Sequence, residues 1–170
     1  LDLARTQMYV PNEFIAQETA KYDNLLFGAS INPLRNDALE RLTWVKDDGA
    51  VLVKWIPSVM LFDPADPRLI PFYQKLVSLR LPLLTHTGHE HSFLGAQQEL
   101  SDPWRLESAL KLGVIVIAAH TAPSGESQGE ENQQALFALM RKYPNLYADI
   151  SALTQANRTG VLESALAQDD

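Results

Sequence analysis

Five short apolar runs recur along the chain, with longer amphipathic stretches between them. Each run is nearly continuous rather than alternating, which is typical of strands buried on both faces of a parallel sheet. Their starts lie about 30 residues apart, which is the length of one strand–helix unit. The pattern therefore predicts five parallel strands, over residues 25–31, 50–56, 81–84, 114–119 and 146–150.

Helix signals lie between these runs. Asp66 and Asp102 each precede a proline, a pairing that places an N-cap before proline at the first helical position. Asn36 is the expected cap of a helix whose apolar face begins at Ala38. Further helices are expected over residues 12–21, 131–142 and 161–168.

The connections distinguish between two parallel-sheet folds, a doubly wound sheet and a barrel. Helix-to-strand turns are tight, whereas strand-to-helix connections are long, at residues 57–66, 87–101 and 121–130. Long loops at one end only are typical of a barrel whose active site lies at the carboxyl ends of its strands. No glycine-rich phosphate-binding pattern follows a strand, which weighs against nucleotide binding. We therefore predict an α/β fold, a (β/α) barrel forming a single domain over residues 1–170.

Composition narrows the range of partners. The formal net charge is −7 and there is no basic stripe, which argues against nucleic acid or anionic lipid as the main partner. No apolar run approaches the roughly 20 residues that span a bilayer, and the N-terminus lacks a signal-peptide pattern. We therefore expect a cytoplasmic protein with a small-molecule substrate, and a homo-oligomer is compatible with this composition. The chain has no cysteine, so a metal ion would need histidine, carboxylate or a modified lysine.

Polar side chains follow the predicted strands at their carboxyl ends. His86 and His120 end two neighbouring strands, and both precede a threonine. Two imidazoles at the mouth of a barrel can share one ion, and zinc prefers such nitrogen ligands. The alternative for each is a core histidine bonded to a backbone carbonyl. Asn32 and Asp149 occupy similar strand ends and are candidates for contacting substrate. Asp149 could instead orient a metal ligand, or equally bond a neighbouring loop.

Lys54 lies inside an apolar run, so its stem is buried and its ammonium group needs a partner. Strand alternation places Lys54 on the barrel interior and Trp55 toward the helices. The lysine is therefore a candidate catalytic residue, with a salt bridge across the barrel as the structural alternative. His89, Glu90 and His91 lie on the long loop after His86, where they either contact substrate, act as a transient third metal ligand, or belong to a solvated polar loop.

A resemblance to the amidohydrolase-related branch of the amidohydrolase superfamily is carried by four segments, AVLVKWIPS, LPLLTHTG, VIVIAAHTA and YPNLYADISAL. The resemblance covers nearly the whole chain in order. It implies a (β/α)8 TIM barrel with one or two divalent metal ions, in which the runs here are strands three to seven. By the same resemblance, His86 is the strand-five ligand and His120 the strand-six ligand. Lys54 then lies on strand four, where some members carry a metal-bridging carbamate.

Two features of that superfamily have no counterpart in this sequence. The first strand of its members ends in a metal-binding His-x-His pair, and their last strand carries an aspartate that binds metal and acts as a base. His89 and His91 form a His-x-His pair in a loop without an apolar strand before it, and Asp149 belongs to strand seven. We therefore expect an incomplete barrel, with the missing segments in the full protein or in another chain.

The resemblance implies metal-dependent hydrolysis of a small molecule, with zinc as the expected ion on His86 and His120. A non-hydrolytic lyase, such as a decarboxylase, is the alternative within the same branch. A metal-free barrel that acts as a binding or assembly subunit is the alternative from another class. Metal analysis separates the last from the first two, and release of CO2 identifies a decarboxylase.

Overall fold

The computed structural model describes residues 9–158 and 160–168, and its centre is a parallel sheet of five strands in the order β1-β2-β3-β4-β7. The strands are β1 Gly28–Ala29, β2 Leu52–Trp55, β3 Leu83–His86, β4 Val116–Ala119 and β7 Leu146–Ala148. All five predicted parallel strands are therefore confirmed. The first is shorter than predicted, because Leu25 and Leu26 are exposed and precede the pairing with β2. The third extends past residue 84 to His86.

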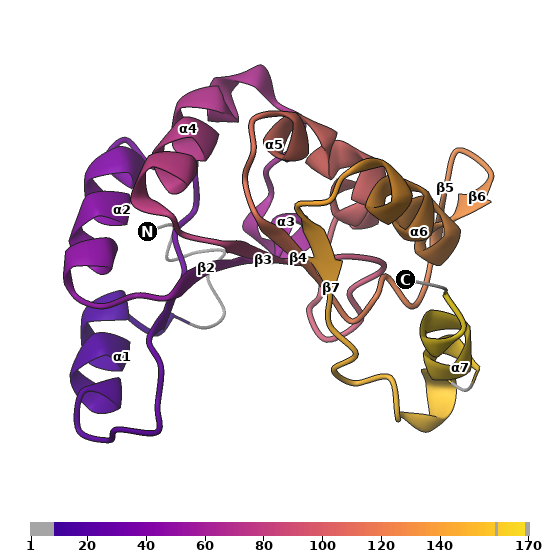
Figure 1. Ribbon diagram of the computed structural model, residues 1–170, viewed down its shortest axis with the longest axis horizontal. Helices are drawn as coiled ribbons and strands as arrows, with labels where there is room; N and C mark the ends of the chain where they lie inside the picture. Colours follow the sequence, from indigo (N-terminus) through magenta and orange to yellow (C-terminus); the bar gives the residue numbers. More distant parts are fainter. Residues whose placement is uncertain (1–8, 159, 169–170) are drawn as a thin grey trace.

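Helices alternate with these strands, as a (β/α) barrel requires. They are α2 Ala38–Asp47, α4 Ile70–Leu79, α5 Glu107–Lys111 and α6 Asn132–Lys142. Figure 1 shows these helices in an arc over one face of the sheet, with the flanking helices α1 Asn12–Thr19 and α7 Val161–Leu166 at its opposite ends. Among residues 9–158 and 160–168, no helix has the length and apolar character needed to cross a membrane.

The long strand-to-helix connections contain short elements that the apolar pattern does not predict. They are α3 Pro57–Met60, the 3-10 helices η1 Pro67–Leu69, η2 Gln98–Ser101 and η3 Pro103–Leu106, and a hairpin of β5 Glu126–Ser127 and β6 Glu130–Glu131. A further 3-10 helix, η4 Ala156–Arg158, follows β7. Elements this short do not show the helical or strand period over enough residues to be predicted.

Two of the predicted helix caps are confirmed and one is wrong. The carboxylates of Asp66 and Asp102 each accept a hydrogen bond from the backbone N–H two residues on, at 2.8 and 2.9 Å. Asn36 is not the cap of α2, because that helix begins one residue later, after Asp37. The carboxylate of Asp37 is bound by the guanidinium group of Arg35, so the entry to this helix is an ion pair rather than a cap.

The two faces of β2 follow the predicted alternation. Val53 and Trp55 are fully buried, whereas Leu52 and Lys54 are half-buried on the opposite face. The indole Nε1 of Trp55 donates to the carbonyl oxygen of Ile31 at 2.8 Å, which satisfies its one polar atom inside the core. The prediction that Trp55 packs in the core is confirmed, and Lys54 is left on the face away from the helices.

Candidate active site

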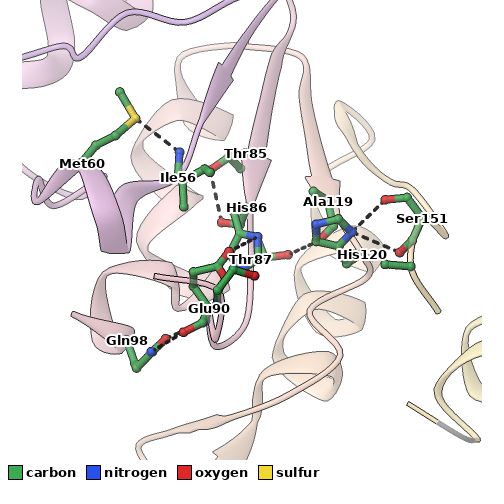
Figure 2. A network of polar contacts seen from close by, with 12 residues as sticks. Ile56, Met60, Thr85, His86, Thr87, Glu90, Gln98, Ala119, His120 and Ser151 are labelled. Atoms are coloured by element: carbon green, nitrogen blue, oxygen red, sulfur yellow. Dashed lines mark hydrogen bonds and ion pairs between the residues drawn. The ribbon is translucent and has the colours of Figure 1, made fainter. Parts of the chain in front are cut away.

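The two candidate metal ligands lie at the carboxyl ends of neighbouring strands. His86 is the last residue of β3, and His120 directly follows β4. Their ring centroids are 5.2 Å apart, with 65° between the ring planes. Figure 2 shows the two rings from these strand ends, with their polar partners around them. The structure therefore brings together the two histidines that the sequence pairs.

His86 and His120 are not paired with each other in the register of β3 and β4. His86 pairs with Ala119, one residue before His120. Alternation along β4 would direct His120 toward the helices rather than toward the interior. Instead, φ is 63° at His120, 53° at Thr121 and 47° at Ala122. This left-handed backbone costs an L-residue about 1–2 kcal/mol, and it turns the imidazole of His120 toward that of His86.

The left-handed turn is held from the end of β7. Asp149 accepts hydrogen bonds on Oδ1 from the backbone N–H groups of His120 and Ser151, both at 2.9 Å. Its carbonyl oxygen accepts from the Thr121 hydroxyl at 2.7 Å. Burial opposes ionisation, but hydrogen bonds from Ser151 and His120 outweigh it and hold the pKa of Asp149 below its usual value. The carboxylate of Asp149 therefore fixes the backbone that carries His120.

The threonine after each histidine ties one strand end to the next. Thr87 donates from Oγ1 to the carbonyl oxygen of Ala119 at 3.0 Å, and Thr121 makes the equivalent bond to Asp149. Both threonines are buried, so these bonds are shielded from water. The repeated His-Thr pair thus joins β3 to β4 and β4 to the end of β7.

A hydrogen-bond network decides which nitrogen of His120 carries the proton. Nδ1 lies 3.1 Å from the carbonyl oxygen of Ser151 and 2.7 Å from its hydroxyl. Because a carbonyl oxygen can only accept, Nδ1 must donate, and Nε2 keeps its lone pair. The Ser151 hydroxyl donates in turn to Asp149. Apart from the Asp-x-Ser spacing of an Asx turn, Ser151 carries no sequence signal, and its role is not predicted.

His86 presents a similar bare nitrogen in a buried setting. Its side chain is 5% exposed, and burial lowers the pKa of His86 to about 4, so the ring is neutral at pH 7. Nδ1 lies 3.7 Å from Oε2 of Glu90. Among the residues that the structure describes, none makes a hydrogen bond to Nε2 of His86, although this atom is buried. A buried polar atom without a partner is rare and is expected at a ligand position.

The loop after β3 places Glu90, rather than its two histidine neighbours, beside His86. Glu90 is buried, with an exposed fraction of 9%. His89 lies against Gly125, where it leaves no room for a side chain, and His91 is exposed. The sequence offers His89 and His91 as candidates for contacting substrate, and that role stays a prediction. No periodic signal in the sequence distinguishes Glu90 from its neighbours, because this segment is a loop, and a spacing of four residues brings side chains together only in a helix.

Lys54 contributes charge to the same region. Burial lowers the pKa of Lys54, and the carboxylates of Asp149 and Glu90 partly oppose this effect. The charge of Lys54 also helps to depress the pKa of His86. Lys54 pairs with Leu84, which lies two residues before His86 on β3, so strand alternation puts Lys54 on the same face of the sheet as His86.

Both polar atoms of the Asn32 side-chain amide form hydrogen bonds with backbone groups. Its Nδ2 donates to the carbonyl oxygen of Met60 at 3.0 Å, and its Oδ1 accepts from the N–H of Leu34 at 2.9 Å. The side chain therefore ties the segment after β1 to α3. Contact between Asn32 and substrate stays a prediction, and these bonds give the residue a structural task.

The donor set fits two positions of a metal centre. The imidazole Nε2 atoms of His86 and His120 are nitrogen donors of the kind that a divalent transition metal ion prefers. Within residues 9–158 and 160–168, no group of three or more histidine, aspartate or glutamate side chains is arranged to hold an ion. The described residues therefore supply part of a ligand set, and a closed centre needs further donors.

Comparison with known families agrees with this geometry. The family model described as Amidohydrolase matches residues 3–169. The chain belongs to the amidohydrolase family. No curated protein matches the chain.

One solved structure similar to this amidohydrolase-family chain is an uncharacterized TIM-barrel protein, Bb4693, from Bordetella bronchiseptica. The two are 21% identical, with a TM-score of 0.69 over 92% of this chain and 55% of the other. The chain thus spans about half the length of that barrel. This likeness shows the fold, and together with the open five-stranded sheet it supports the predicted partial (β/α) barrel.

Proposed function

We propose that this chain forms part of the metal centre of a barrel enzyme that hydrolyses a small molecule, with zinc as the expected divalent ion. The observation that carries the proposal is the pair of bare Nε2 atoms on His86 and His120, in rings 5.2 Å apart. Membership of the amidohydrolase family supports it. When bound, such an ion polarises a carbonyl group and lowers the pKa of a bound water.

The chain's own residues prepare both ligands for binding. His86 and His120 would bind through Nε2, because Nδ1 of each ring faces an acceptor on a loop. Burial keeps His86 neutral, so no proton has to leave before the nitrogen can bind. Asp149 and Ser151 orient His120 through its backbone and its ring.

Elemental analysis of purified variants tests this function. His86→Ala and His120→Ala are each expected to lose bound zinc and turnover while keeping a folded circular dichroism spectrum. The matched control for metal content is His91→Ala, which removes an exposed histidine from the loop after β3. Full metal content in both site variants would refute the proposal. Release of CO2 without hydrolysis would assign the decarboxylase chemistry instead.

We assign Lys54 to the same site as the group that binds a carboxylate of the substrate. An ammonium near a divalent ion is repelled by it, so Lys54 would stand off from the ion and contact substrate. Lys54→Met keeps the stem and removes the charge, and loss of activity at unchanged metal content is expected. Lys46→Met on α2 is the control. Loss of one metal equivalent, restored by short carboxylic acids, would favour a carbamate, and unchanged turnover would exclude both roles.

A metal-free binding subunit is the second candidate function. It is favoured by one observation, that the described part of the chain holds no group of three acidic or histidine side chains suited to an ion. The same elemental analysis decides between the two, because a binding subunit would contain no stoichiometric metal and would show no turnover. Its ligand would then be sought by thermal-shift screening of small molecules.

A further inference from the structure

A clamp pins the loop between β3 and η2 over His86. The side chain of Gln98 accepts a hydrogen bond from the backbone N–H of Glu90 on Oε1 and donates from Nε2 to the Glu90 carbonyl oxygen, both at 2.7 Å. Figure 2 shows this pair beside His86. One amide side chain therefore satisfies both backbone groups of Glu90 and fixes where its side chain begins.

The two carboxylate oxygens of Glu90 have different neighbours. Oε1 accepts from the backbone N–H of Ser92 at 2.5 Å, and Oε2 lies 3.7 Å from Nδ1 of His86. Glu90 and His86 are both more than nine-tenths buried. Because Oε1 is occupied by Ser92, Oε2 is the Glu90 atom that faces the ring, and its lone pairs favour a proton on the facing Nδ1 of His86.

We propose that Glu90 is a positioning residue for His86, whose carboxylate keeps the imidazole proton on Nδ1 so that the bare Nε2 is available to a metal ion. The proposal rests on the proposed function, because the ion is what the bare Nε2 would bind. Ser151 does the same for His120 by accepting from its Nδ1. Each histidine thus has its proton held by an acceptor from a different loop.

The asymmetry of the Glu90 contacts gives a sharp expectation for Glu90→Gln. The N–H of Ser92 needs an acceptor, so the amide oxygen would stay on Ser92. The amide NH2 would then face Nδ1 of His86, where two donors cannot meet. The proton of His86 is therefore expected to move to Nε2, the atom proposed to bind metal. Loss of such an outer partner typically weakens metal binding about 10- to 100-fold.

Two-bond 1H–15N correlation spectra of the metal-free protein at pH 7 measure this directly, because they show which imidazole nitrogen carries the proton. We expect His86 to carry it on Nδ1 in the wild type and in Glu99→Gln, which neutralises an exposed carboxylate of the adjacent helix η2. In Glu90→Gln the proton is expected on Nε2 of His86, with His120 unchanged. The same tautomer in the wild type and in Glu90→Gln would overturn the proposal.

A second variant and a binding measurement complete the test. Gln98→Ala loosens the backbone of Glu90 while leaving its carboxylate in place, and a mixture of His86 tautomers is expected. A single, wild-type tautomer in Gln98→Ala would show that the clamp has no part in it. Zn2+ affinity is measured by competition with a chromophoric chelator, and a drop of about 10- to 100-fold is expected in Glu90→Gln. If the wild type binds no Zn2+, the proposed function fails, whereas the tautomers still decide the role of Glu90.

Discussion

Replacing Asp149 by alanine tests whether one carboxylate holds the left-handed turn that carries His120. Oδ1 of Asp149 accepts from two backbone N–H groups, those of His120 and Ser151, both at 2.9 Å. Hydrogen bonds to charged groups contribute about 1.5–3 kcal/mol each, and we take about 1 kcal/mol because Asp149 is half-exposed and water replaces part of the loss. The variant should therefore lose about 2 kcal/mol of stability.

The bond from the Thr121 hydroxyl to the backbone carbonyl oxygen of Asp149 does not depend on the carboxylate, so the turn is expected to keep this tie in the variant. Urea denaturation measures the stability, and the melting temperature should fall by about 4–8 °C. Asp149→Asn is the control, because its amide keeps an oxygen on both N–H groups and should lose less than half as much. A stability of Asp149→Ala within about 0.5 kcal/mol of the wild type would refute the reasoning.

Three further predictions concern the stability of the scaffold. Arg80 follows α4 with a left-handed backbone, at a φ of 51°, and its side chain is exposed. Because glycine adopts this conformation without strain, Arg80→Gly should stabilise the protein by about 0.5–1 kcal/mol in urea titrations. A lower urea midpoint than that of the wild type would contradict this prediction. Gly113→Ala at a φ of 86° should cost about 1 kcal/mol in the same titrations, and an unchanged midpoint would contradict it. Hydrogen bonds from Lys111 and Lys142 hold the pKa of Glu107 at about 2, so its contribution is present above pH 4.5 and is lost as the pH falls toward 2. Glu107→Gln should therefore flatten the acid limb of a stability-against-pH curve without changing the fold, and an unaltered limb would count against it.

The order of strands and helices could be predicted because each apolar run is nearly continuous in the sequence. Val53, Leu83 and Val116 are fully buried, whereas Val51 and Ile115 in the same runs are exposed, so it is apolar continuity rather than uniform burial that marks these strands. The first strand was predicted too long, because Leu25 and Leu26 are apolar yet exposed. An apolar residue on the surface looks the same in the sequence as one in the core.

The residues of the candidate site could likewise be predicted only in part from the sequence. His86 follows from simple alternation, because it lies on the interior face of its strand together with Leu84. His120 reaches the site only through a left-handed turn, and no residue pattern announces such a turn in a stretch without glycine. Glu90 and Ser151 depend on where two loops fold back, which a single sequence does not encode as a periodic signal.

The left-handed turn after β4 also has a consequence for protein design. Copying His86 and His120 onto another barrel at the same strand positions would leave the second imidazole pointing outward, because ordinary strand geometry sends it there. A transplant would have to include Asp149 on the adjacent strand, since its carboxylate holds the turn. The smallest transferable unit of this site is therefore three neighbouring strand ends rather than a pair of ligands.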